Sequence, residues 1–179
     1  MATATKKNTE TVIDKGADLT APSENKPIIP KDVDINQLIT VRNGFQGRLV
    51  YVSPRTKERF VWDQFGDEQE VELRELRNAK SSAKKFFSNN WFMFDDEFAW
   101  VIDYLGVKQF YKNAIKLDEF DEVFKQTPAK LKDTISKLSP GQKKSISYRA
   151  RQLVMDGAID SLKLIAAIEE ALGIELIEH

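Results

Sequence analysis

The sequence contains no cysteine and a single histidine, His179, which is its last residue. Without cysteine, disulfide bonds, thiol catalysis and Cys-ligated metal sites are excluded, and the composition fits a reducing compartment. With its one histidine at position 179, the chain has no internal His for a catalytic triad or a His-ligated metal. It also lacks a Walker loop and a GxGxxG motif. We therefore predict a protein that is not an enzyme and that binds no cofactor or metal.

Long apolar runs are also missing. No stretch approaches the roughly 18 apolar residues of a membrane span, and residues 1–20 have no apolar segment of signal-peptide length. The formal net charge of −1 argues against a surface that binds nucleic acid or anionic lipid as a whole. We therefore expect a protein without membrane contact that is made in a cytoplasm.

Residues 1–36 are rich in Thr, Lys, Ala, Asp and Pro and show no apolar periodicity. A segment of this composition cannot bury enough apolar surface to offset the entropy lost on ordering, so we predict a disordered or extended arm. Ile28 and Ile29 lie between Pro27 and Pro30 without local apolar partners. They are candidate anchors with which the arm docks on a neighbouring protein, whereas the simpler alternative is a passive tail.

Residues 37–76 favour a small β subdomain. Runs rich in β-branched and aromatic residues cover residues 37–41, 45–53 and 58–65. Asn43-Gly44, between the first two runs, is a strong hairpin signal. Because three short strands are marginal alone, we expect a fourth strand near residues 70–73, a covering helix, or both.

Residues 77–115 form an aromatic-rich hub, because ten of the 18 aromatic residues lie between Phe86 and Tyr111. Each aromatic side chain can bury about 150–250 Å², and no single helix or strand periodicity accommodates all ten. Other elements must pack on several sides of the hub, either from this chain or from another. Trp91, Phe92 and Trp100 are therefore its candidate protein-interaction residues. Apolar spacing predicts helices over residues 72–87, 97–105 and 108–114.

Two acidic runs, Asp95–Glu97 and Asp118–Glu122, carry carboxylates of the kind that bind divalent cations. Each run also lies at a predicted helix start, where acidic side chains cap the helix and complement its dipole. We interpret both runs as structural caps, in line with the prediction of no metal site.

Residues 116–179 have helical spacing and helix signals throughout, which predicts a C-terminal helical subdomain. Thr127-Pro128 and Ser139-Pro140 each place an N-cap before a proline at the first helical position. Gln142 adds a capping box to the second of these, and Gly173 ends the last helix. The predicted fold class is α+β: a disordered arm, a small antiparallel β-sheet or partial barrel, the aromatic hub and a C-terminal helical bundle.

Basic side chains gather in residues 129–151. They are Lys130, Lys132, Lys137, Lys143, Lys144, Arg149 and Arg151, against one acidic residue, Asp133. Two helices joined at Ser139-Pro140 are similar in outline to a helix-turn-helix. An alternative function is therefore a small DNA-binding regulatory protein that contacts nucleic acid through Lys143, Lys144, Arg149 and Arg151.

Three stretches, over residues 41–80, 81–94 and 139–176, resemble proteins of tailed bacteriophages that are encoded among virion structure and assembly genes. The resemblance covers about residues 38–177 and brings no functional residue with it. It implies a capsid, neck, tail or baseplate component, or an assembly factor. Its partners would be other virion proteins or further copies of itself, in the host cytoplasm during assembly and then in the virion. The leading prediction is a non-catalytic virion structural or assembly protein that acts through protein contacts.

Overall fold

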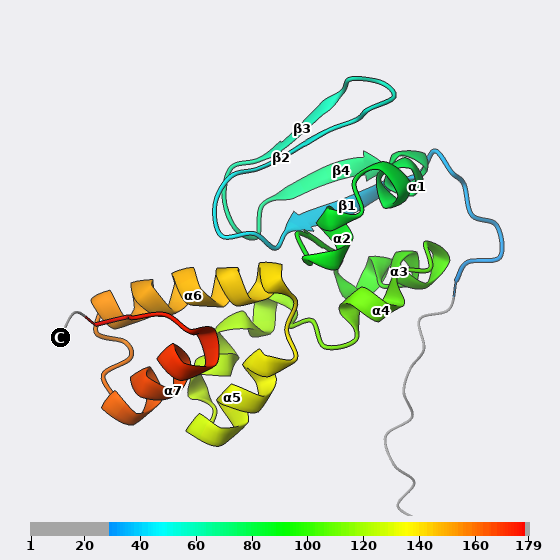
Figure 1. The fold of residues 1–179 in the computed structure, drawn as a ribbon. Coiled ribbons are helices and arrows are strands. Elements are labelled where there is room, and N and C mark those ends of the chain that lie inside the picture. Colours follow the sequence, from blue (N-terminus) through cyan, green and yellow to red (C-terminus); the bar gives the residue numbers. More distant parts are fainter. Residues whose placement is uncertain (1–28, 178–179) are drawn as a thin grey trace, which may run out of the picture.

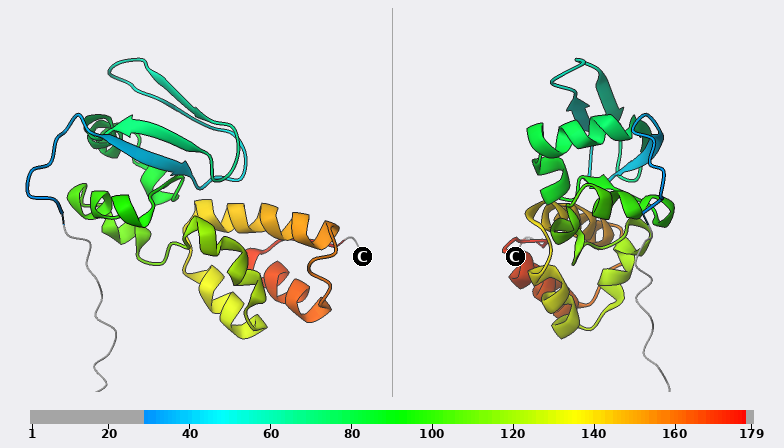
Figure 2. Two further views of the ribbon diagram at one scale, coloured as in Figure 1. Left: turned by 180° about the vertical axis from the view of Figure 1, so that it is seen from behind. Right: turned by 90° about the vertical axis from the view of Figure 1, so that its right-hand side faces the viewer.

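The computed structural model describes residues 29–177, which form two parts that lie side by side (Figures 1 and 2). The strands and helices α1–α4 make up the first part, and helices α5–α7 belong to the second. Most of the predicted arm, Ile28 included, lies outside the described residues. Within residues 29–177, no helix has both the length and the apolar character needed to cross a membrane.

All strand pairs of the first part are antiparallel, which confirms the α+β prediction with a small antiparallel sheet. Strand β1 (Leu38–Asn43) lies between β4 (Glu68–Glu72) and β5 (Phe92–Met93). Strands β2 (Leu49–Val52) and β3 (Arg59–Trp62) form a separate hairpin. The hairpin is tied to the sheet by the Trp62 indole, whose Nε1–H donates to the carbonyl of Val41 at 2.8 Å.

The expected hairpin at Asn43-Gly44 is wrong, because β1 pairs with β4 and β5 rather than with β2. The Asn43 side chain is fully buried, and its Nδ2 donates to the carbonyls of Gly47 and Gln64 at 2.8 Å each. Its Oδ1 accepts the backbone N–H of Phe45. The asparagine therefore joins two loops of the first part instead of turning one strand back on its neighbour.

The β subdomain and the aromatic hub share one hydrophobic core, so residues 37–111 are one structural unit rather than two. Tyr51 illustrates this, because its ring packs against Phe60 of the hairpin and against Phe86 and Phe92 of the hub. The Tyr51 hydroxyl donates to the buried carboxylate of Glu75 at 2.6 Å. Burial, together with this hydrogen bond, raises the pKa of Tyr51.

The helix expected over residues 72–87 is broken at Ala83 into α1 (Leu73–Ser82) and α2 (Lys85–Ser88). The break lets Phe86 and Phe87 both point into the core, where they are 5% and 0% exposed. The rest of the hub consists of η1 (Asp96–Phe98), α3 (Trp100–Tyr104) and α4 (Lys108–Tyr111).

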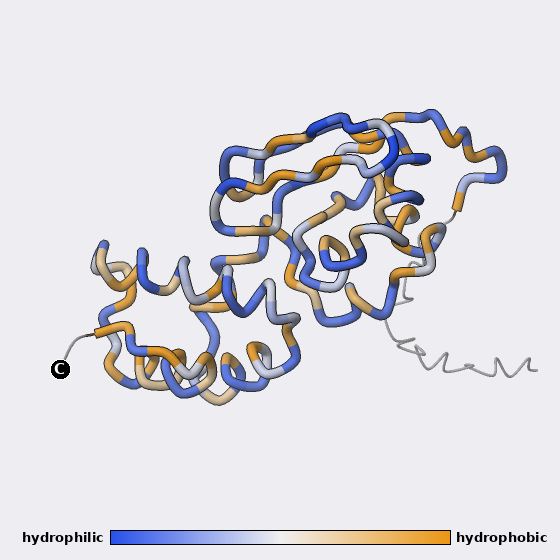
Figure 3. Tube along the Cα trace, turned by 45° about the horizontal axis from the view of Figure 1, so that its top comes forward, coloured by the Kyte–Doolittle hydropathy of each residue, from blue (hydrophilic) through white to orange (hydrophobic). Residues whose placement is uncertain are grey.

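The second part has its own hydrophobic core, and apolar stretches occur in both parts (Figure 3). Its elements are η2 (Leu117–Lys125), α5 (Pro128–Ser136), α6 (Pro140–Met155) and α7 (Leu162–Leu172). Phe120, Leu131, Ile146 and Ile168 are among its buried side chains. Phe65, from the loop before β4, reaches this core and lies 4.8 Å from the Phe120 ring.

Phe92→Ala should lower the free energy of unfolding by about 3–5 kcal/mol, because a fully buried ring is removed and a cavity is left. Urea unfolding followed by tryptophan fluorescence would measure this. Val52→Ala is the matched control, since Val52 is 48% exposed. Equal unfolding midpoints for the two variants would contradict the placement of Phe92 in the core.

Candidate functional site

The two parts meet at the start of α6 by close backbone contact. Between the two parts, a Cβ at Gly141 would lie 2.1 Å from the carbonyl oxygen of Asn89. Next to this contact, within the first part, a Cβ at Gly44 would lie 2.1 Å from the carbonyl oxygen of Asn90. The buried Ser145 hydroxyl donates to the Gly44 carbonyl at 3.0 Å. We call these five residues the junction, and its tightness requires glycine at both close approaches.

Gln142 ties the connecting segment to α6. The Ser139 hydroxyl accepts the Gln142 backbone N–H at 3.1 Å, as expected of an N-cap. The Gln142 side chain does not complete a capping box, because its Oε1 accepts from the Ile115 N–H at 3.0 Å and its Nε2 donates to the Ile115 carbonyl at 2.8 Å. The residue that sequence reasoning assigned to capping therefore holds the link between the two parts.

Arg42 of β1 forms ion pairs with carboxylates from both parts. Its guanidinium lies 2.9 Å from Asp95 and 3.2 Å from Asp118, and 3.6 Å from Glu68 of the neighbouring strand. Burial lowers the pKa of Arg42, but the hydrogen bonds to Asp95 and Asp118 raise it by more. Arg42 thus stays charged and links the sheet to the start of η2.

The acidic runs lie at helix starts as predicted, with Asp96 and Glu97 in the first turn of η1 and Asp118 and Glu119 in that of η2. The expected capping hydrogen bonds are wrong, because ion pairs take their place. The Asp95 side chain makes no capping hydrogen bond to η1 and pairs with Arg42 instead. Asp96 pairs with Lys116 at 2.6 Å. In the part of the chain that the structure describes, no group of three or more acidic or His side chains is placed to hold a metal ion.

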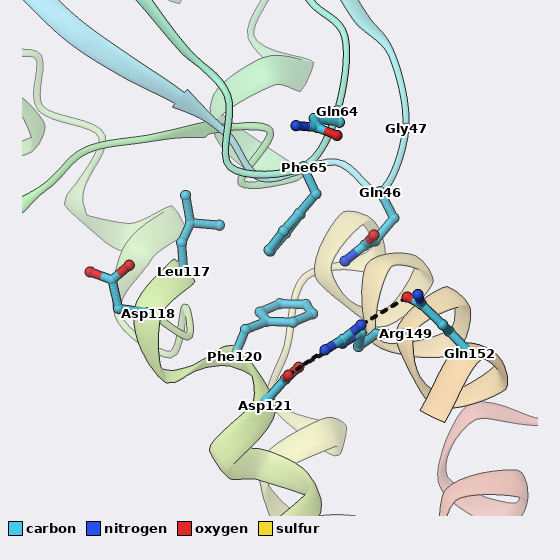
Figure 4. Close-up of a pocket in the computed structure, with 10 residues that line it drawn as sticks. All are labelled: Gln46, Gly47, Gln64, Phe65, Leu117, Asp118, Phe120, Asp121, Arg149 and Gln152. Carbon is cyan, nitrogen blue, oxygen red and sulfur yellow. Dashed lines mark hydrogen bonds and ion pairs between the residues drawn. The ribbon is translucent and has the colours of Figure 1, made fainter. Parts of the chain in front are cut away.

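A cleft of about 510 Å³ opens between the two parts (Figure 4). Gln46 and Gln64 line it from loops of the first part, and Arg149 lines it from α6. The Arg149 guanidinium donates to Asp121 at 2.8 Å through Nε and to Gln152 at 2.8 Å through Nη1. Its hydrogen-bonding groups are thus directed to neighbours in the same chain.

The predicted nucleic-acid contacts are therefore not equivalent. Arg149 is held by Asp121, whereas Lys144 and Arg151 are exposed and Lys143 is partly exposed. Elsewhere in residues 129–151, Lys137 pairs with Asp133 and Lys132 with Glu170. Intramolecular partners thus offset part of the positive charge that the sequence suggested.

Two of the predicted protein-interaction residues are corrected, because the structure buries them. Phe92 is 0% and Trp100 is 8% exposed, and both pack within the first core. Trp91 is partly buried, with its ring against Phe45 and Phe86. Ile29 is 41% exposed, so among the predicted protein-interaction residues that the structure describes it is the side chain most open to a partner.

Among the large apolar side chains of the described residues, the two with the highest exposed fractions lie where α6 turns into α7. Met155 is 86% exposed and Leu162 is 75% exposed. Gly157, at φ +72°, reverses the chain after α6 and allows the Ile159 N–H to reach the Leu153 carbonyl. This turn folds Ile159 into the second core, and Met155 and Leu162 stay outside it.

A shallow pocket of about 240 Å³ lies at the same end of the helical part. Its apolar lining comes from Phe124, Leu153, Ala158, Ile159 and Leu164. We call Met155, Leu162 and this lining the apolar end. Sequence reasoning missed the apolar end, because periodicity alone does not say which apolar residues the turn after α6 leaves exposed.

Comparison of the chain with protein-family models, with curated proteins and with solved structures finds no match.

Gly141→Ala should lower the free energy of unfolding by about 1–3 kcal/mol, because the added methyl group would meet backbone that cannot rotate away. All three tryptophans pack in the first core. Tryptophan fluorescence therefore reports on that part, whereas far-UV circular dichroism also reports on the second. We expect the two unfolding transitions to separate in Gly141→Ala but to coincide in the control, Ser147→Ala. Coincident and unshifted transitions in Gly141→Ala would contradict the tight junction.

Asp121→Asn tests the ion pair in the cleft. The hydrogen bond from Arg149 lowers the pKa of Asp121 from its ordinary value of 3.8. Its contribution to stability is therefore complete above that value and is lost as the pH falls through the lower, folded-state pKa. At neutral pH the variant should lose about 0.2–1 kcal/mol, typical of a part-exposed pair.

The difference in unfolding free energy between Asp121→Asn and the wild type should become smaller in acid, because Asp121 is then protonated in the wild type and no longer forms the ion pair. Urea unfolding at neutral pH and well below the ordinary pKa would measure it. Glu119→Gln, at an exposed position, controls for the change in net charge. A loss that is the same at both pH values would argue against the ion pair as its cause.

Proposed function

We propose that this chain is a non-catalytic structural or assembly protein of a tailed bacteriophage, and that it acts through protein contacts. The observation that carries the proposal is the apolar end, where the exposed Met155 and Leu162 lie in the same chain segment, residues 153–164, as most of the apolar lining of the pocket. Clustered exposed apolar side chains on a folded protein mark interaction surfaces, because their burial against a partner removes apolar area from water.

The junction supports the same proposal. A protein that connects others must hold its contact surfaces at a fixed distance and angle. The close approach of Gly141 to Asn89 and the hydrogen bond from Ser145 to Gly44, both between the two parts, provide this. The resemblance to phage virion proteins supplies the setting: the host cytoplasm during assembly and then the virion. The partners would be other virion proteins.

We also propose that the N-terminal arm docks on a neighbour. Within its described residues 29–36, the arm carries two exposed aliphatic side chains, Ile29 and Ile35, at 41% and 42% exposure. They would extend the anchor expected at Ile28 and Ile29 along an apolar strip. Such a strip can lie in a groove or add to a sheet edge of another protein.

DNA binding remains the second candidate function, and one observation favours it. Lys144 lies 5.9 Å from the centre of the exposed Tyr148 ring, with Arg151 one helical turn further along α6. Basic groups beside an exposed aromatic ring suit a nucleic-acid strand. An affinity for DNA that falls steeply with salt would support this candidate.

Changing Met155 and Leu162 together to Asp should strongly reduce incorporation of the chain into particles, because a charge desolvated at a contact is costly. Mass spectrometry of purified particles would measure incorporation, and thermal unfolding would confirm that the variant still folds. Ala129→Asp with Ala166→Asp is the matched control, since both alanines are exposed on helices of the same part. Particles that never contain the wild-type chain would overturn the proposed function.

A further inference from the structure

One face of α6 combines positive charge with exposed apolar surface. Lys144, Tyr148, Arg151 and Met155 follow one another at spacings of four, three and four residues, so they lie along one line of the helix. Tyr148 is 49% exposed and Met155 is 86% exposed. We call these four residues the basic stripe. Tyr and Arg on one surface are typical of the residues that dominate protein interfaces.

The basic stripe continues across the junction into the first part. The Lys144 ammonium lies 5.8 Å from the centre of the Phe45 ring, and that ring lies 5.9 Å from Trp91. Lys85 in turn lies 5.9 Å from the Trp91 ring. Lysines thus alternate with partly exposed rings over both parts, and cation–π attraction holds the ammonium groups at this surface.

The outer face of the sheet has the opposite charge. In the β1–β4 register, Leu38 pairs with Glu72, Thr40 with Glu70 and Arg42 with Glu68. The alternate residues Ile39, Val41 and Val71 are 0% exposed, so these three pairs share the outer face. The Glu68 side chain is 59% exposed and Leu38 is 52% exposed. We call Leu38, Thr40, Glu68, Glu70 and Glu72 the acidic face.

The negative charge extends from the acidic face around Arg42. Asp95, Asp96 and Asp118 adjoin it through the ion pairs that Arg42 and Lys116 make. With Glu68, Glu70 and Glu72, these are six carboxylates. The basic side chains paired with them in residues 29–177 are Arg42, Arg74 and Lys116. The group therefore has a formal excess of three negative charges, although the whole chain carries only −1.

The basic stripe and the acidic face also match in length. Lys144 and Arg151 are about 10 Å apart along the helix axis, and Met155 is about 6 Å further. Glu68 and Glu72 are about 13 Å apart along β4. A helix laid on this face can therefore bring the Lys144 and Arg151 side chains to carboxylates of the acidic face. In the same position Met155 meets Leu38, the apolar side chain beside Glu72.

We infer that the basic stripe of one copy docks on the acidic face of a second copy. The inference rests on the proposed function and deepens it by naming one partner, the chain itself. Because the two surfaces differ, the contact is head-to-tail, and a bound pair still offers one free basic stripe, on one copy, and one free acidic face, on the other. Such contacts build rings when the rotation closes and filaments when it does not.

Charge reversal on either surface tests the inference. Lys144→Glu with Arg151→Glu, or Glu70→Lys with Glu72→Lys, should weaken self-association by about 10- to 100-fold, because attraction becomes like-charge repulsion. Sedimentation velocity over a concentration series, at low and high salt, would measure this for the full chain. The wild type should exceed the 20.5 kDa of one copy, most clearly at low salt.

The decisive result is the recovery of self-association when the charges of the two surfaces are exchanged. A chain with both reversals carries an acidic helix and a basic sheet face, and it should self-associate again. An equimolar mixture of the two singly reversed proteins should also assemble. Lys112→Glu with Lys130→Glu, at exposed positions outside both surfaces, gives the same net charge as the reversed helix and should leave the association unchanged.

A wild type that stays monomeric at low salt would overturn the inference, and so would an association that the control and the reversed helix weaken equally. Binding of single- or double-stranded DNA by a monomeric chain, lost in Lys144→Glu with Arg151→Glu, would assign the basic stripe to nucleic acid instead. Failure of the inference can be told apart from failure of the proposed function. That proposal fails if particles lack the chain, whereas incorporation of every charge variant at wild-type level would count against the self-contact alone.

Discussion

The structure depends most on the approach of Gly141 to the carbonyl of Asn89, where the start of α6 lies against the turn that follows α2. The two chain segments are so close that a single methyl group has no room. Asn90, in the same turn, has a positive φ of 54°, and its Nδ2 donates to the Phe110 carbonyl. The turn is thereby fixed from the first part, and α6 is positioned against a rigid surface.

Charged side chains have two roles in this molecule. Some ion pairs, above all those of Arg42 with Asp95 and Asp118, link segments far apart in the sequence. Each part-exposed pair adds little stability alone, but together they favour one arrangement of the two parts. Other charges form two groups of opposite sign, with acidic side chains on the outer sheet face and basic side chains on α6. A near-neutral total therefore hides a polarised surface.

Much of the local structure could be predicted from the sequence, because its signals are local. The helix α6 begins where Ser139-Pro140 indicated, with the Ser139 cap in place, and Gly173 ends α7 in a left-handed conformation. In each case the deciding groups are within a few residues of one another.

The strand pairing and the site could not be predicted in the same way. Pairing β1 with β4 rather than β2 depends on the burial of Asn43 between two loops, and these contacts span up to 21 residues. Aromatic content indicated a core but not which rings face inward, so Phe92 and Trp100 were assigned to a surface. The acidic runs looked like caps, because their partners Arg42 and Arg149 are distant in sequence.

The junction also has a geometric consequence for any assembly built from this chain. The acidic face belongs to the first part and most of the basic stripe to the second, so the angle between the two parts sets the turn from one copy to the next. An error of a few degrees would add up along a series of copies and change a closed ring into an open helix, or alter its diameter. The absence of a side chain at position 141 would then help to set the curvature of a much larger object.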